Sequence, residues 1–133
     1  MRYVLLVLTL ALAGIGQSIG ESPQSPRQQG QSESEQSIPE SQLEERDGLQ
    51  YRMSSTEPYT GKTVGRFYSG QMRSETNYKN GKKDGKSNTF FENGRLRLEA
   101  SYKDGKRDGQ WIKRDANGQV QFHRFYRAGT KVH

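Results

Sequence analysis

Hydrophobic and polar residues alternate in three stretches of this chain. In the middle stretch the apolar set is Leu96, Leu98, Ala100 and Tyr102, with polar residues between its members. The matching sets elsewhere are Met72, Ser74, Thr76 and Tyr78, and then Val120, Phe122, Arg124 and Tyr126. A period of two places each set on one face of a β-strand. The pattern predicts three strands that each end in a tyrosine on the same face.

The same residues recur at a fixed interval. An eight-residue stretch from Tyr78 to Gly85 returns 24 residues later, from Tyr102 to Gly109, and a shortened copy begins at Tyr126. Ser-Gly or Asn-Gly dipeptides keep the same interval at residues 69–70, 93–94 and 117–118. A fixed period of this size is typical of repeat proteins, in which each unit is one supersecondary element stacked on the next.

The Asn-Gly dipeptides predict β-hairpins. Asn93-Gly94 favours a two-residue type I′ turn, because both central positions of that turn need positive φ. Such a turn pairs Phe91 with Leu96, Thr89 with Leu98 and Ser87 with Ala100. We therefore expect an all-β fold, an elongated antiparallel sheet of about six strands with a lead-in strand around residues 49–53.

The final hairpin and the connecting segments give further expectations. The same register places Trp111 opposite Arg124, as a cation–π pair. In the connections, Gly81, Gly85, Gly105 and Gly109 would supply positive φ, and Asp84 and Asp108 would accept hydrogen bonds from nearby backbone N–H groups.

The chain before the repeats divides into two segments. Residues 1–20 hold an apolar run, Tyr3 to Leu12, between a basic start and small residues, which is typical of a signal peptide. Residues 21–45 are rich in Ser, Gln and Glu and predict a disordered linker before a domain at residues 46–133. We expect export to the periplasm or the outside of a bacterium; the alternative is an uncleaved membrane anchor.

Charge is divided unevenly along the chain. Residues 21–48 carry seven acidic and two basic side chains, whereas residues 49–133 carry 18 basic and eight acidic ones. A basic surface favours an acidic protein, anionic lipid, an anionic envelope polymer or nucleic acid, and export disfavours nucleic acid. The alternative is that the charge only keeps the protein soluble.

Two surfaces are candidates for binding a partner. The first is the pair of basic dipeptides in the connections, Lys82, Lys83, Lys106 and Arg107. The second is the aromatic face, represented by Tyr78, Phe91, Tyr102 and Trp111. A salt series separates them, because screening weakens only the electrostatic surface.

The sequence offers no catalytic, metal or cofactor site. The stretch from Asp104 to Asp115 echoes an EF-hand loop, but Lys106 stands at its third ligand position, where a calcium site needs oxygen. No nucleophile elbow, phosphate loop or metal-spaced ligand set occurs. We expect a non-enzymatic protein without a cofactor.

Two motifs carry a resemblance to a known family. The segment from Gly85 to Leu96 reads Gly-x-x-x-x-Phe-Phe-Glu-Asn-Gly-x-Leu, and the segment from Tyr102 to Trp111 reads Tyr-Lys-Asp-Gly-Lys-x-Asp-Gly-x-Trp. Together with lead-in segments at residues 46–51 and 57–61, they resemble the bacterial MORN-repeat variant family over residues 46 to about 131.

That resemblance implies antiparallel β-hairpins in an elongated sheet. Many members of the family are described as antitoxins of toxin–antitoxin systems, and eukaryotic MORN proteins are linked to membrane and scaffold roles. This sequence departs from the pattern where the family has tryptophan, since Thr63 and Ser87 occupy positions that match Trp111. Aromatic residues are also missing at Glu92 and at Arg114-Asp115, so the last repeat is degenerate.

Our interpretation from sequence is an exported, non-enzymatic interaction or scaffold module with an acidic protein partner. The alternatives are an antitoxin or immunity-like protein, which a secreted chain fits badly, and a binder of anionic lipid or envelope polymer.

Overall fold

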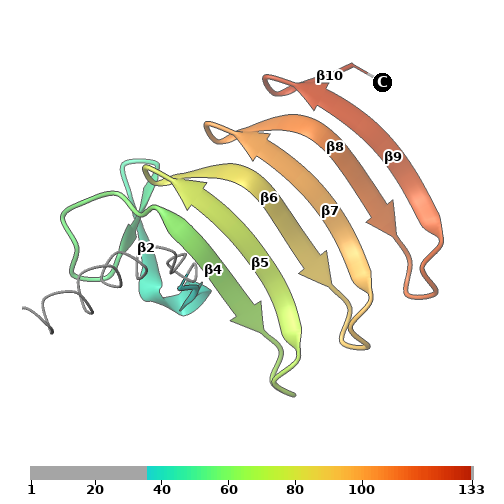
Figure 1. Ribbon diagram of the computed structural model, residues 1–133, viewed down its shortest axis with the longest axis horizontal. Helices are drawn as coiled ribbons and strands as arrows, with labels where there is room; N and C mark the ends of the chain where they lie inside the picture. The colour runs from blue at the N-terminus through green and yellow to red at the C-terminus, as the bar shows by residue number, and fades with distance from the viewer. Residues whose placement is uncertain (1–35, 133) are drawn as a thin grey trace, which may run out of the picture. The chain divides into compact units, whose positions relative to one another are not determined.

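The computed structural model describes residues 36–132, and this part of the chain is all-β, as the alternation predicted (Figure 1). Its one helical element is the short 3-10 turn η2 (Glu40–Gln42). The strands are β1 (Ile38–Pro39), β2 (Leu43–Arg46), β3 (Leu49–Arg52), β4 (Gly61–Arg66), β5 (Met72–Lys79), β6 (Lys82–Phe90), β7 (Leu96–Lys103), β8 (Lys106–Arg114), β9 (Val120–Arg127) and β10 (Thr130–Lys131).

Strands β4 to β9 form the predicted antiparallel meander and lie side by side in chain order (Figure 1). Two short strands extend this sheet at its ends: β1 pairs in parallel with β4, and β10 pairs with β9. The expected lead-in strand exists as β3, but it pairs with β2 in a separate two-stranded sheet.

The Asn-Gly loops differ from the turn type that the sequence predicted. In the loop between β6 and β7, Phe91 N–H donates to Arg95 O at 2.8 Å and Gly94 N–H donates to Phe91 O at 2.9 Å. Gly94 has a φ of 84°, whereas Asn93 does not have positive φ. This is a three-residue loop, a type I turn followed by a left-handed glycine, and not a type I′ turn. Asn-Gly suits both geometries, since each needs glycine at its last position.

Two-residue turns with positive φ at both positions lie at the opposite end of the strands. In the meander they are Asn80-Gly81 (50° and 80°), Asp104-Gly105 (47° and 78°) and Ala128-Gly129 (47° and 89°), and Asp47-Gly48 (51° and 79°) forms another between β2 and β3. Positive φ at Gly81, Gly85, Gly105 and Gly109 is therefore confirmed. The segments that we expected to be polar connections are tight hairpin turns followed directly by strand.

The predicted register between β6 and β7 is correct in the middle of the strands and wrong at their end. Thr89 pairs with Leu98 and Ser87 pairs with Ala100, as expected. A register shift between Thr89 and Phe90 then brings Phe90, in place of Phe91, opposite Leu96. The extra residue of the three-residue loop causes this shift, because it leaves two residues of one strand opposite one of the other.

The most buried side chains form one row across the sheet. Strand pairing links the row residue by residue: Thr63, Thr76, Ser87, Ala100 and Trp111. All five are buried, and Ala100 is only 2% exposed. Small side chains fill most of the row, so Trp111 supplies most of its apolar volume and packs with Tyr126, Leu98, Tyr102 and Phe122.

Residues 38–45 correct the predicted boundary of the disordered linker, because they form β1, η2 and most of β2. Ile38 is 8% exposed and pairs with Thr63, so a buried apolar side chain anchors a segment whose composition is mostly polar. The predicted signal peptide and the rest of the linker lie outside the described residues. Within residues 36–132, no helix is long and apolar enough to cross a membrane.

Candidate functional site

Aromatic rings gather on the face of the sheet that carries the predicted tyrosines. The centroids of Tyr59 and Tyr78 lie 6.1 Å apart. Further along the sheet, the Trp111 ring lies 5.4 Å from Tyr102 and 5.5 Å from Tyr126, both at steep angles. Tilted contacts at these distances are favourable for aromatic pairs. The tyrosines that end β5, β7 and β9 therefore share one surface.

Two of the four predicted basic residues belong to this same surface. Lys83 pairs with Tyr78 and places its Nζ 5.1 Å from the Tyr102 ring. Arg107 pairs with Tyr102, and its guanidinium lies 4.6 Å from the Trp111 ring and 5.2 Å from the Tyr126 ring. Cations at such distances are attracted to the faces of the rings. The electrostatic and aromatic candidates therefore overlap on this surface.

We call this surface the aromatic–basic face, made of Tyr78, Lys83, Tyr102, Arg107, Trp111 and Tyr126. Its members differ in access to solvent, because Arg107 is exposed while Trp111 and Tyr126 are buried. A partner would meet the cations and the rims of the tyrosines first. Trp111 supports this surface from beneath, as its indole N–H donates to Ser101 O at 3.2 Å.

The tyrosine hydroxyls report this environment in their pKa values. Burial raises the pKa of Tyr78 above its ordinary value, and the neighbouring Tyr102 adds to the increase. Burial also raises the pKa of Tyr102, against an opposing effect of the Arg107 charge. For Tyr126, burial acts in the same direction, but hydrogen bonds and positive charges from Arg124 and Arg107 outweigh it and lower the pKa.

The remaining predicted site residues lie elsewhere. Lys82 and Lys106 pair with Lys79 and Lys103 on the opposite face of the sheet. Phe91 lies in the loop after β6, with its ring 5.8 Å from the guanidinium of Arg97.

The expected pair of Trp111 and Arg124 is only half correct. Trp111 and Arg124 are partners in the ladder, but the Arg124 guanidinium lies over Phe122, at 4.2 Å.

Each tight turn is bound to the preceding repeat. The carboxylates of Asp84 and Asp108 accept hydrogen bonds at 3.1 Å from Asp104 N–H and Ala128 N–H, 20 residues later in each case. The predicted acceptor role is therefore confirmed, but the donor belongs to the next turn and is distant in sequence. Thr60 takes the equivalent role, since its hydroxyl accepts from Asn80 N–H at 2.9 Å. These bonds fix the spacing between neighbouring turns.

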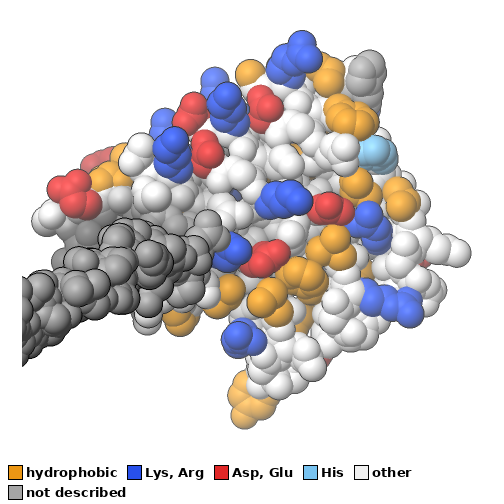
Figure 2. Space-filling view, viewed as in Figure 1, with side chains coloured by type: hydrophobic (Ala, Val, Ile, Leu, Met, Phe, Trp, Pro, Cys, Tyr) orange, Lys and Arg blue, Asp and Glu red, His pale blue; other side chains and the backbone are white. Residues whose placement is uncertain are grey.

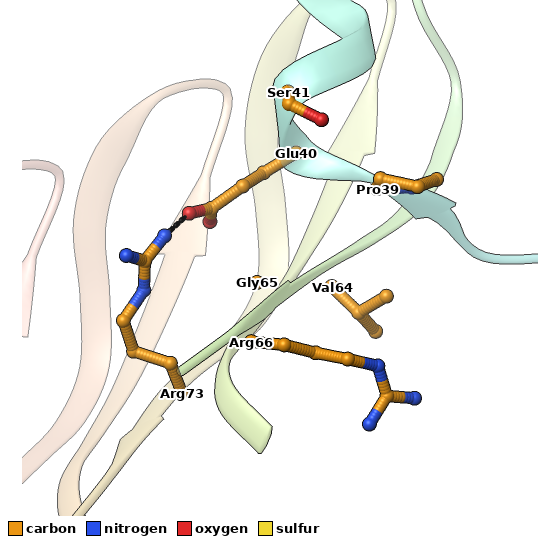
Figure 3. A pocket seen from close by; sticks show the side chains of 7 residues that line it. All are labelled: Pro39, Glu40, Ser41, Val64, Gly65, Arg66 and Arg73. Atoms are coloured by element: carbon orange, nitrogen blue, oxygen red, sulfur yellow. Dashed lines mark hydrogen bonds and ion pairs between the residues drawn. The ribbon is translucent and has the colours of Figure 1, made fainter. Parts of the chain in front are cut away.

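A hollow of about 620 Å³ lies where η2 meets β4 (Figure 3). The Glu40 carboxylate contacts Arg73 and accepts a hydrogen bond from Ser74 Oγ at 2.8 Å. Gly65 makes room for it, because a side chain there would meet Glu40 at 2.6 Å. Glu40 fell inside the predicted linker, so no pattern along the chain pointed to this contact. Its charge is already matched by Arg73, which makes the hollow a structural junction.

Among residues 36–132, no group of three or more histidine or acidic side chains is arranged to hold a metal ion. Two of the three carboxylates in the EF-hand-like stretch have separate roles. Asp108 accepts from Ala128 N–H, and Asp115 accepts from Asn117 N–H at 2.9 Å and from Gln119 N–H at 3.0 Å. These carboxylates order loops within the fold.

Comparison with known proteins agrees with this geometry. Residues 83–104 match the family model described as MORN repeat variant, a segment that runs through β6, the loop after it, β7 and into the next tight turn. Neither the curated proteins nor the solved structures contain a match to the chain. The matched segment and the recurrence of its hairpin at a 24-residue interval support a MORN-repeat family for this chain.

Proposed function

We propose that this chain is an exported, non-enzymatic interaction module that binds an acidic protein partner through the aromatic–basic face. The observation that carries the proposal is the placement of Lys83 and Arg107 over the rings of Tyr102, Trp111 and Tyr126. MORN repeats are commonly protein or lipid interaction modules, which favours a binding role over catalysis.

The composition of this face suits protein recognition. Tyrosine, tryptophan and arginine are enriched at the centres of protein interfaces, because they bring large contact area with few rotatable bonds. The rings of the neighbouring repeats hold the cations in position before a partner arrives. Their ordering on binding therefore costs little side-chain entropy. An acidic partner would complete pairs that the free protein leaves facing solvent.

The test is capture of envelope proteins on the immobilised, processed protein, with elution across a salt series. The double variant Lys83→Gln, Arg107→Gln should lose the partner. The matched control Lys86→Gln, Arg97→Gln removes the same charge from exposed positions outside the face and should retain it. Equal loss of partner binding in both variants would show that the total positive charge matters and that this face has no specific role.

Two further outcomes would favour the alternatives. Binding that is indifferent to salt but lost in Tyr102→Ala, in a variant that still folds, would assign recognition to the rings alone. Protection against the product of a neighbouring toxin gene would identify an antitoxin, and binding to anionic vesicles without any protein partner would identify a lipid adaptor.

Export has its own measurement. From the apolar run and the small residues after it, we expect the mature N-terminus to lie between Gly14 and Glu21. Mass spectrometry of the protein recovered outside the cytoplasm should find it there. An intact Met1 on cytoplasmic protein would contradict export without affecting the binding proposal.

A further inference from the structure

The tight turns line up along one rim of the sheet and carry an excess of positive charge. This turn rim comprises residues 79–84, 103–108 and 127–131, which hold eight basic and three acidic side chains. The loops at the other ends of the strands, residues 67–71, 91–95 and 115–119, hold one basic and two acidic side chains. Figure 2 shows blue basic side chains along the rim that bears the turns, with fewer red acidic ones among them. The charge is therefore concentrated at one end of every hairpin.

Two like-charged pairs face each other across these turns. Lys79 pairs with Lys82, and Lys103 pairs with Lys106. Directly opposed side chains have their Cβ atoms only about 5 Å apart, and like charges in that position oppose strand pairing. All four lysines are exposed, and none has an ion pair among residues 36–132. A fold that keeps such pairs twice in register retains positive charge available for a ligand.

The carboxylates of the turn rim form no ion pair with these lysines among the described residues. The carboxylates of Asp84 and Asp108 each accept a hydrogen bond from a backbone N–H of the following turn. Asp104 stands between Lys103 and Lys106 as the one acidic side chain within the three tight turns, and it forms no ion pair among the described residues.

The rim also has room for an anionic group beside its lysines. A shallow hollow of about 180 Å³ lies between the first turns, lined by Lys82, Lys83, Gly81, Gly105 and Gly48. The Lys82 stem runs along the next turn, since a side chain on Gly105 would meet its Cβ and Cδ at 3.7 Å. The N–H groups of Gly81 and Gly105 already donate to Tyr59 O and Lys83 O, so an anionic group in this hollow would be held by the Lys82 ammonium and not by the backbone.

We infer that the turn rim binds a linear anionic polymer, which lies across successive turns. Equivalent residues of neighbouring turns stand two strands apart, so the cations repeat about every 9.5 Å and the three turns span roughly 19 Å. A chain with negative charges at that interval or closer meets every turn at once, whereas a compact anion meets one. The opposed lysines of the rim, Lys79, Lys82, Lys103 and Lys106, lie on the other side of the sheet from Lys83 and Arg107, the two rim cations that belong to the aromatic–basic face. The inference therefore goes beyond the proposed function.

Binding of inorganic polyphosphate to the full chain, measured by isothermal titration calorimetry, tests this inference. Long-chain polyphosphate should bind at least tenfold more tightly than triphosphate at equal phosphate concentration, since linked contacts act together. The rim variant Lys79→Gln, Lys82→Gln, Lys103→Gln, Lys106→Gln should weaken long-chain binding about tenfold or more. The control variant Arg66→Gln, Lys86→Gln, Arg95→Gln, Arg97→Gln removes the same charge from exposed positions and should change binding by about twofold or less.

Thermal unfolding shows whether the rim variant remains folded. The rim variant should melt at the same temperature as the original chain or higher, because it removes two like-charged pairs. Three results would overturn the inference: equal weakening in the rim and control variants, triphosphate binding as tightly as the long chain, or binding to vesicles of anionic phospholipid without binding to polyphosphate.

Discussion

Replacing Trp111 with serine tests whether one side chain provides most of the apolar packing of the sheet. Serine is the residue that the preceding repeat has at the equivalent position, Ser87, so the backbone there accepts it. If every repeat contributed equally to stability, the substitution would lower the free energy of unfolding only slightly. The structure predicts a large cost instead, because Trp111 contacts Tyr102 and Tyr126 and lies in the core cluster.

The expected loss of unfolding free energy is about 3–5 kcal/mol, the range for truncating a large buried aromatic side chain. Two aromatic contacts of about 0.5–1.5 kcal/mol each make up some of this loss. The hydrogen bond from the indole N–H to Ser101 O contributes about 1 kcal/mol more. Trp111→Phe keeps a ring but loses that donor, so it should cost roughly 1–2 kcal/mol.

Urea unfolding followed by far-ultraviolet circular dichroism measures these losses, since the substitution removes the chain's single tryptophan and its fluorescence. Tyr68→Ser is the matched control: Tyr68 is fully exposed, and its truncation should change stability by less than about 0.5 kcal/mol. A loss below about 1 kcal/mol for Trp111→Ser would refute the packing argument.

Four further predictions concern other parts of the fold. Ile38→Ala should cost about 2–4 kcal/mol in urea unfolding, because Ile38 is buried against β4 and does not belong to a disordered linker; a neutral result would contradict that assignment. Gly109→Ala should destabilise more than Gly94→Ala, since both have positive φ but only the new side chain at 109 meets a neighbour, at 3.1 Å; equal melting temperatures would refute this. The raised pKa of Tyr102 stabilises the fold fully below about pH 10 and loses that effect as pH rises through the raised value, so Tyr102→Phe should flatten the alkaline fall in stability. In an ultraviolet titration Tyr126, whose pKa is lowered, should ionise before Tyr102; the reverse order would contradict the arrangement of charges.

Local patterns in the sequence were enough to predict the meander and most of its pairing. Alternation in residues 96–102 and the fixed interval between repeats define the faces and the order of the strands. The register at Ser87 and Thr89 followed from the loop position alone. The turn type did not follow, because Asn-Gly suits both a two-residue turn and a three-residue loop.

Other features depend on contacts between residues far apart in the chain. The partner of Asp84 lies 20 residues later, and Ile38 becomes buried only because β4 offers an edge beside it. The division of the basic dipeptides between two faces was available from the sequence, since neighbours such as Lys82 and Lys83 must point in opposite directions on a strand. The prediction of each dipeptide as a single basic site did not separate the two faces.

The hydrogen bonds that join each turn to the previous repeat also bear on how this protein changes length during evolution. Every such bond connects two residues that lie 20 positions apart in adjacent repeats. Gain or loss of a whole 24-residue unit therefore leaves each turn beside an equivalent acceptor. Duplicating one hairpin would reproduce the turn, its acceptor and its neighbours without creating a new kind of contact. Gain or loss of a few residues inside a unit would instead shift the acceptors out of line with every later turn. The chain can therefore be lengthened or shortened by unequal recombination in steps of one hairpin, and a longer version would carry a proportionally longer line of cations.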